Sequence, residues 1–252
     1  MRTVLLCLHG WGGSKESFTE LRQALTGTDI LILTPDLPGF GNEPEPSRPW
    51  NTDDYADWVR AYLVKNQSLS GNEQPLLYIL GHSHGGRIAI KLAVSGEQVA
   101  SSTIGHLYLC AAAGVRRPRH FKRILGLIFA KAGSLLLSIP GLRRLQPLGK
   151  KMLYRLVRVH DYEQASPVMR ETLIRVTQED LRPLLPSIMI PTDIFWGTED
   201  QMTPIADAEV MHKAIKGSRL HTYPGVRHAV HRNRAREIAA VIRQQLEQTG
   251  ES

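Results

Sequence analysis

The chain has 252 residues, of which 42% are hydrophobic, and it carries a formal net charge of +7. This length and apolar content suit one sizeable α/β core with an inserted segment. The two cysteines, Cys7 and Cys110, each lie inside an apolar run, which excludes a disulfide framework or a cysteine-based metal site and favours buried free thiols.

The amino-terminal run Met1 to Leu8 resembles a signal peptide but is too short for one, because its apolar stretch stops at His9. The residue before Cys7 is Leu6 and not the small residue that a cleavage site needs. We therefore interpret this run as the first buried strand, expect the mature chain to start at Met1, and expect a cytoplasmic protein.

Short apolar runs alternate with helical patterns along the chain. The predicted strands span residues 3–8, 30–34, 76–80, 106–111, 192–196 and 219–223. The predicted helices span residues 14–25, 52–65, 84–94, 204–215 and 232–248. Continuous apolar strands separated by helices are typical of a parallel sheet that is covered on both faces. We therefore expect an α/β fold with a doubly wound, mainly parallel sheet of about six strands.

One long interval interrupts this alternation. Residues 115–180 have a helical and basic pattern without a convincing strand. We predict that they form a helical cap between the fourth and fifth strands, and that residues 1–114 and 181–252 form the core domain. The stretch Ile124 to Leu142 is apolar, but Lys131 and Pro140 interrupt it, so we do not interpret it as transmembrane.

A G-x-S-x-G motif, Gly81-His82-Ser83-His84-Gly85, lies directly between a predicted strand and a predicted helix. In this context the chain turns sharply, and the serine hydroxyl stands clear of the sheet as a nucleophile. Gly81 and Gly85 keep side chains out of a crowded turn whose central residue has strained backbone geometry. The motif therefore predicts Ser83 as a catalytic nucleophile, with a structural turn serine as the alternative.

Four segments, in this order, make the chain resemble the α/β-hydrolase family. They are His9-Gly10-Trp11-Gly12, Pro35 to Gly41, Gly81 to Gly86, and Gly197 to Pro204. The resemblance extends over nearly the whole chain. It implies a hydrolase fold in which the acid follows the serine and the histidine comes last. The family usually has an antiparallel pair of strands before the His-Gly loop, and that loop starts here at residue 9, so we expect those strands to be missing.

Asp200 is the predicted acid, because it lies in the loop after a strand, where its carboxylate can turn back over the sheet edge. The alternatives are Asp193, which would lie within the strand, and the neighbouring Glu199. Asp200 can also be interpreted as a structural acid at the start of the helix near Pro204.

His228 is the predicted base among ten histidines, because it follows the last strand in a loop and matches the family's base position. The family often has Gly where this chain has Arg227. The nearest alternative is His231, which would already enter the final helix, whereas His106 and His221 are interpreted as strand residues.

Two backbone N–H groups are predicted to form the oxyanion hole. The amide of His84 follows the nucleophile at a helix start, and by resemblance the amide of Trp11 supplies the second donor. We expect His9, Gly10, Trp11 and His82 to line the substrate pocket. A dinucleotide loop starting at Gly10 is excluded, since Lys15 stands in place of the third glycine, and Asp36 is interpreted as structural.

The predicted cap concentrates the positive charge of the chain. Between residues 116 and 160 there are twelve basic residues and no Asp or Glu: Arg116, Arg117, Arg119, Lys122, Arg123, Lys131, Arg143, Arg144, Lys150, Lys151, Arg155 and Arg158. The simpler interpretation is an amphipathic cap helix with a solvated basic face. The alternative is attraction to anionic lipid or to acidic substrates. Nucleic-acid binding is disfavoured, because the aromatic residues of this segment are too scattered for base stacking.

These features predict a serine hydrolase that cleaves carboxylic esters through an acyl-enzyme and needs no metal or cofactor. The same residues also serve lipases or lysophospholipases, thioesterases, lactonases and C–C bond hydrolases. Epoxide hydrolases and haloalkane dehalogenases are disfavoured, because related members of the fold use aspartate in place of Ser83. A hydrolase-like ligand receptor is the non-enzymatic alternative. The sequence leaves the natural substrate, acyl length and oligomeric state open.

Overall fold

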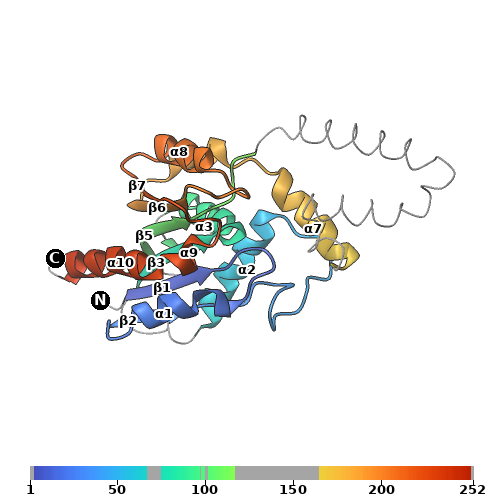
Figure 1. Cartoon of the computed structure of the whole chain (residues 1–252). Coiled ribbons are helices and arrows are strands. Elements are labelled where there is room, and N and C mark those ends of the chain that lie inside the picture. Colours follow the sequence, from blue (N-terminus) through green and yellow to red (C-terminus); the bar gives the residue numbers. More distant parts are fainter. Residues whose placement is uncertain (1–2, 67–74, 97, 100–101, 117–164, 251–252) are drawn as a thin grey trace, which may run out of the picture. The chain divides into compact units, whose positions relative to one another are not determined.

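The computed structural model of the chain describes residues 3–66, 75–96, 98–99, 102–116 and 165–250. Within these residues the strands form one sheet in the order β2-β1-β3-β5-β6-β7 (Figure 1). All neighbours along this order are parallel, and the short β4 pairs antiparallel with β5. The strands are β1 (Thr3–Leu8), β2 (Ile30–Leu33), β3 (Leu76–His82), β4 (Gln98–Val99), β5 (Ser102–Cys110), β6 (Thr192–Gly197) and β7 (Arg219–Tyr223). The predicted α/β fold with a mainly parallel sheet of about six strands is confirmed.

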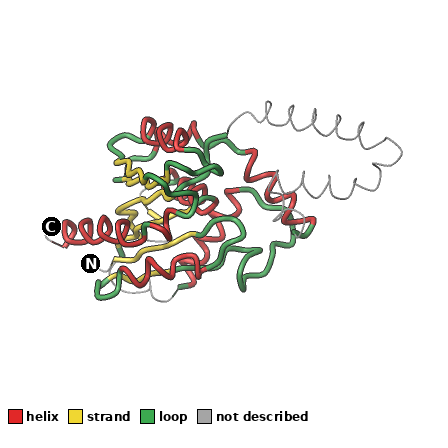
Figure 2. Tube along the Cα trace, in the orientation of Figure 1, coloured by secondary structure: helices red, strands yellow, loops and turns green. Residues whose placement is uncertain are grey.

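Figure 2 shows how helices alternate with these strands along the described chain. The helices are η1 (Lys15–Phe18), α1 (Thr19–Ala24), α2 (Thr52–Lys65), α3 (His84–Val94), α7 (Pro167–Gln178), η4 (Arg182–Ser187), α8 (Ile205–Ala214), α9 (Val230–Asn233) and α10 (Ala235–Gly250). The start of α2 illustrates the local cause of such boundaries. The side chain of Asn51 accepts a hydrogen bond from the amide of Asp54, whose carboxylate accepts one from the amide of Asn51 in return.

The connections that follow β1 and β3 lead to opposite sides of the sheet. From β1 it passes through α1 to β2, and from β3 it passes through α3 to β5 on the other side. Because parallel crossovers are right-handed, α1 and α3 cover opposite faces of the sheet. Helix α10 packs against α1, and α2 packs against α3. The carboxyl ends of β1 and β3 therefore form a topological switch point, where open α/β sheets bind ligands.

The centre of the core lies along the middle strands. In β1 the side chains of residues 4–8 are fully buried, and in β3 all seven residues are buried. The edge strands β2 and β7 are only partly buried. This pattern follows from the two helical layers, since a strand covered on both faces needs apolar residues without alternation.

Several predicted boundaries differ from those in the structure. Strand β5 begins at Ser102 rather than at 106, and its amino end pairs with β4, which was not predicted. The first predicted helix divides into η1 and α1. The last divides into α9 and α10, because the backbone leaves the helical conformation at Arg234. Such short breaks depend on tertiary packing, which the hydrophobic pattern does not report.

The chain divides into two compact units, one formed by residues 1–116 and 171–252 and the other by residues 117–170. The predicted cap, residues 115–180, stays a prediction. Residues 117–164 lie outside the described part of the chain, and so do all of the twelve basic residues between positions 116 and 160 except Arg116. Among the helices that are described, none is both long and apolar enough to cross a membrane.

A buried carboxylate links three neighbouring strands, β5, β6 and β7. Asp193 in β6 accepts hydrogen bonds from His106 in β5 (2.8 Å), His221 in β7 (2.6 Å) and the guanidinium of Arg219 (2.6 and 2.9 Å). Burial raises the pKa of Asp193, but these hydrogen bonds outweigh it and hold the pKa well below its ordinary value. This position within β6 makes Asp193 part of the core.

Candidate active site

Ser83 lies at the sharp turn between β3 and α3. Its φ of 52° and ψ of −111° lie outside the regions that non-glycine residues favour. The backbone around it is tightly held, because its amide donates to the carbonyl oxygen of Cys110 (3.1 Å) and its own carbonyl oxygen accepts from the amides of Gly86 (3.0 Å) and Ala113 (2.9 Å). Strain of this kind persists only where the surroundings impose it, and it concentrates at functional sites.

The glycines of the motif allow the turn to pack this closely. A Cβ atom on Gly81 would lie 2.5 Å from the carbonyl oxygen of Gly85, and one on Gly85 would lie 2.0 Å from that of Leu8. Both distances are far below van der Waals contact. The turn therefore requires glycine at these two positions, and the carboxyl end of β1 lies directly against it.

Asp200 and His228 are brought together in the loops that follow β6 and β7. The Nδ1 atom of His228 lies 2.8 Å from Oδ2 of Asp200. Because an ionised carboxylate only accepts, Nδ1 carries the proton of this bond, and in a neutral imidazole Nε2 is then the nitrogen that can accept a proton. Burial raises the pKa of Asp200, but the hydrogen bond and charge of His228, together with hydrogen bonds from Thr203, outweigh it and lower the pKa. The carboxylate therefore stays ionised beside the imidazole.

Backbone contacts between the two loops explain this meeting. The amide of Glu199 donates to the carbonyl oxygen of Val226 (3.0 Å), and the amide of Thr198 donates to that of Tyr223 (3.1 Å). Gly197 permits the contact, because a Cβ atom there would lie 2.2 Å from the Val226 oxygen. These contacts between the loops hold Asp200 and His228 next to each other at the carboxyl edge of the sheet.

The alternatives for the acid and the base occupy other places. Glu199 is exposed, and Asp193 lies inside β6 at the opposite edge of the sheet. His106 and His221 are strand residues bound to Asp193. His231 is buried in α9, and among the described residues neither of its ring nitrogens has a hydrogen-bond partner. Of these candidates, only His228 forms a hydrogen bond with Asp200.

Thr203 supports the acid and was missed by the sequence analysis. Its hydroxyl donates to Oδ2 of Asp200 (2.8 Å), and its amide donates to Oδ1 (3.0 Å). The amide of Met202 also donates to Oδ1 (2.8 Å), and the indole of Trp196 fixes the loop by donating to the carbonyl oxygen of Thr203 (2.7 Å). The only signal in the sequence for this role of Thr203 was its position three residues after Asp200. Asp and Thr side chains at this spacing often form hydrogen bonds with the local backbone.

The predicted oxyanion donors lie at the turn after β1 and at the start of α3. The amide of Gly13 closes the first turn by donating to the carbonyl oxygen of Gly10 (3.0 Å), and His84 is the first residue of α3. Among the described residues, neither the amide of Trp11 nor that of His84 has an acceptor. The side chains of Trp11 and His84 meet edge to face, with ring centroids 5.5 Å apart.

The other predicted pocket residues have distinct surroundings. His9 is fully buried, its Nε2 accepts from the amide of Leu37 (2.9 Å), and its Nδ1 donates to the carbonyl oxygen of Gly10 (2.8 Å). These bonds leave neither ring nitrogen for a ligand, so the geometry favours a structural role. Gly10 lies against the turn, since a Cβ atom there would come within 3.2 Å of Ser83 Cβ and 3.1 Å of His82 Cδ2.

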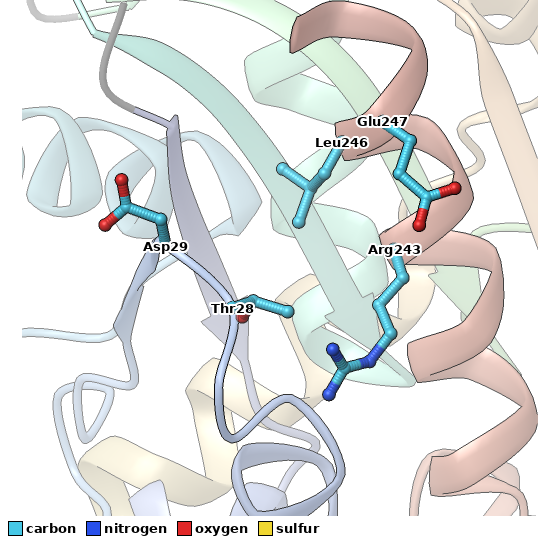
Figure 3. Close-up of a pocket in the computed structure, with 5 residues that line it drawn as sticks. All are labelled: Thr28, Asp29, Arg243, Leu246 and Glu247. Carbon is cyan, nitrogen blue, oxygen red and sulfur yellow. The ribbon is translucent and has the colours of Figure 1, made fainter.

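Outside the turn at Ser83 and the loops after β6 and β7, the described residues contain a small pocket but no cluster of metal ligands. No group of three or more His, Cys, Asp or Glu side chains suited to a metal ion occurs in them. The pocket in Figure 3 lies at the amino edge of the sheet, between the residues before β2 and helix α10. There Arg243 donates to the carbonyl oxygens of Ala24 (2.8 Å) and Thr26 (3.0 Å), so its guanidinium closes the end of α1.

Comparison with known proteins places this geometry in context. Residues 5–241 match the Alpha/beta hydrolase family. A pimeloyl-[acyl-carrier protein] methyl ester esterase of Neisseria meningitidis is 27% identical over 249 residues, which cover 95% of this chain and 92% of the relative. Lipase 1 of Psychrobacter immobilis is 25% identical over 224 residues, and the match covers 84% of this chain and 66% of the lipase.

Solved structures share the fold. An esterase from Exiguobacterium antarcticum superposes with a TM-score of 0.70 at 23% sequence identity, covering 97% of this chain and 92% of the esterase. At this identity the likeness establishes the arrangement of strands and helices and leaves the chemistry to the residues of the site.

Proposed function

The chain belongs to the alpha/beta hydrolase family, and from this premise we propose that it is a serine hydrolase that cleaves carboxylic esters through an acyl-enzyme. The observation that carries the proposal is the pairing of His228 with Asp200 at 2.8 Å, at the sheet edge where Ser83 occupies a strained turn. Ser83, Asp200 and His228 would supply a nucleophile, an acid and a base, in the chain order that the family has.

In the first step the Oγ atom of Ser83 attacks the acyl carbonyl carbon, and its proton passes to Nε2 of His228. The imidazolium then holds protons on both nitrogens, and Asp200 stabilises this charge through Nδ1–H. The tetrahedral intermediate collapses when the ester C–O bond breaks and His228 returns its proton to the leaving alkoxide. The products of this half-reaction are the alcohol and acylated Ser83.

Water completes the cycle by the same route in reverse. His228 takes a proton from the water as the oxygen attacks the acyl carbon, and the proton then goes to Oγ of Ser83 as the acid is released. We assign the amides of Trp11 and His84 to the oxyanion in both steps, because fixed N–H donors stabilise the developing negative charge. Gly10 allows this loop to lie close to the reacting carbon.

Esters are favoured over the other substrates of this fold by the names of the relatives, which include lipases and a methyl ester esterase. Lipase or lysophospholipase, thioesterase, lactonase and C–C hydrolase activities remain alternatives, as does a ligand receptor. A panel of aryl esters from acetyl to palmitoyl, with lactones, thioesters and lysophospholipids, tests this. Many turnovers on one ester class support the proposal, whereas a single stoichiometric binding event favours the receptor.

We further propose that the protein works in the cytoplasm and that its basic segment between residues 116 and 160 attracts anionic lipid. The first proposal is supported by Cys7 and Cys110, which are buried free thiols. The second is supported by the charge of the sequence alone, twelve basic residues without an acidic one. Fractionation of cells and binding to vesicles of defined charge test the two proposals separately.

A further inference from the structure

Three histidine rings lie together where β3 meets the loops after β6 and β7. The rings of His82 and His231 are stacked, with centroids 3.7 Å apart and an interplanar angle of 29°. The rings of His82 and His228 are 4.8 Å apart and inclined at 51°. His82 therefore contacts both the base of the proposed reaction and a second histidine that the reaction does not use.

The ring of His82 is fixed relative to the nucleophile. Its Nδ1 donates to the carbonyl oxygen of Cys110 at 3.0 Å, and the amide of Ser83 donates to the same oxygen at 3.1 Å. Gly10 lies against the ring edge, because a Cβ atom there would approach Cδ2 of His82 to 3.1 Å. The ring of His231 is stacked on one face of His82.

His231 is an unusual choice for this position. It is only 3% exposed, and neither ring nitrogen has a hydrogen-bond partner in the part of the chain that the structure describes. Buried polar atoms without partners destabilise a protein and call for an explanation. The ring makes aromatic contacts instead, with the face of His82 on one side and with Phe18 at 5.5 Å and 61° on another.

We propose that His231 is a positioning residue, whose ring supports His82 against His228 and thereby fixes the imidazole plane in which Nδ1 of His228 meets Asp200. This inference rests on the proposed ester hydrolysis. Proton transfer needs a well-aligned base, and a small displacement of a catalytic group lowers the rate strongly. The rigid aromatic ring of His231 restricts the tilt of the neighbouring His82 ring better than a flexible side chain would.

The electrostatics of the three rings suit this role. Burial, assisted by the nearby charge of His228, lowers the pKa of His231 to about 3. Burial likewise lowers the pKa of His82 well below its ordinary value, and the charges of His231 and His228 add to the effect. Both rings therefore stay neutral while His228 carries the proton. Neither ring therefore adds a repelling charge near the imidazolium, and the ring of His82 stays in contact with it.

The test compares two variants. His231→Leu removes the aromatic ring, whereas His231→Phe keeps an aromatic ring and removes the two nitrogens. Two rates are measured in the whole protein: turnover of p-nitrophenyl acetate, and the first-order labelling of Ser83 by a small fluorophosphonate. We expect His231→Leu to lower kcat and the labelling rate about tenfold at an unchanged KM. We expect His231→Phe to stay within about threefold of the unchanged protein and to unfold at an equal or higher temperature.

Two further variants secure the comparison. His231→Met replaces the ring by a flexible side chain that fills irregular space, and it serves if the leucine variant does not fold. His212→Leu, on the exposed face of α8, controls for the loss of a histidine elsewhere.

The outcomes separate the inference from the function on which it rests. If the leucine, methionine and phenylalanine variants all keep the wild-type rates, the positioning role is overturned. It is also overturned if all three lose activity equally, since the ring nitrogens would then be the functional atoms. A wild-type protein that neither turns over the ester nor labels at Ser83 would instead contradict the proposed function.

Discussion

The imidazole of His228 donates to the carboxylate of Asp200 across 2.8 Å, although 28 positions separate them in the sequence. Neither residue is held by regular secondary structure. The contact depends on backbone hydrogen bonds between the loops after β6 and β7, where the carbonyl oxygens of Val226 and Tyr223 accept from Glu199 and Thr198. This pair therefore reports on the integrity of both loops.

Replacing Ser83 by Ala should lower ester turnover by about four orders of magnitude or more, because the nucleophile is lost. Steady-state kinetics on a short aryl ester measure this effect. A fluorophosphonate should label Ser83 alone in the unchanged protein, as identified by mass spectrometry of its peptides. An active alanine variant, or labelling of a different serine, would contradict the assignment.

The strain at Ser83 gives this experiment a stability control. At a φ of 52° alanine is as strained as serine, whereas glycine is not. Ser83→Gly should therefore be more stable to urea than Ser83→Ala, by about 1 kcal/mol. Equal unfolding midpoints for the two variants would show that the turn is relaxed.

Loss of the base should be nearly as severe as loss of the nucleophile. We expect His228→Ala to reduce kcat by about four orders of magnitude, and Asp200→Asn to have an intermediate to severe effect because the imidazole loses its orienting acceptor. His231→Ala should be mild by comparison. If His231→Ala is the inactive variant and His228→Ala the mild one, the base has been assigned to the wrong histidine.

Thr203 should matter through the acid that it supports. Thr203→Val keeps the shape of the side chain but removes the hydroxyl that donates to Asp200 at 2.8 Å, so we expect kcat to fall about tenfold. Thr203→Ser retains the hydroxyl and should keep most of the activity. Parallel kinetics and thermal unfolding of the two variants distinguish a local effect on the acid from a general loss of stability.

Asp193 should govern stability at acid pH without affecting catalysis directly. Its pKa is lowered in the folded state, so its contribution to stability is complete above the pKa of the unfolded chain and is lost as the pH falls through the folded value. Asp193→Asn should be less stable by about 3 kcal/mol at pH 7, because His106, His221 and Arg219 lose a buried charged acceptor.

The stability of Asp193→Asn should depend on pH in a way that tests the role of the charge. In urea unfolding between pH 7 and pH 2, the difference in stability between the unchanged protein and Asp193→Asn should shrink below about pH 4, where the unfolded carboxyl takes up its proton. A difference that stays constant over this range would mean that the charge of Asp193 is not what stabilises the strands.

The basic segment leads to a prediction from charge alone. Activity on esters in anionic vesicles should exceed activity on zwitterionic vesicles and should fall steeply with added salt, while turnover of a small neutral ester changes little. Changing Arg143, Arg144, Lys150 and Lys151 to Glu should abolish the vesicle preference and spare the soluble reaction. Equal rates on both vesicle types, without salt dependence, would leave only a solubilising role for these charges.

Much of the fold was predictable because its signals are local. The apolar runs at residues 3–8 and 219–223 became β1 and β7 with the predicted bounds, and α2 and α3 also match their predictions. Strand β4 and the break at Arg234 were not predictable in this way. Both depend on which segments pack against them, and a single-sequence pattern contains no such information.

The candidate site also has a part that the sequence predicted and a part that it did not. The sequence by itself determined the turn at Ser83, because a strand, a tight glycine-flanked turn and a helix are encoded by adjacent residues. It also limited the acid and the base to a few loop positions. Only the tertiary structure decided that Asp200 meets His228, that Thr203 supports the acid, and that His231 stacks on His82. Side-chain contacts between distant loops are set by the backbone hydrogen bonds and close packing of the assembled sheet, so the spacing of residues along the chain cannot specify them.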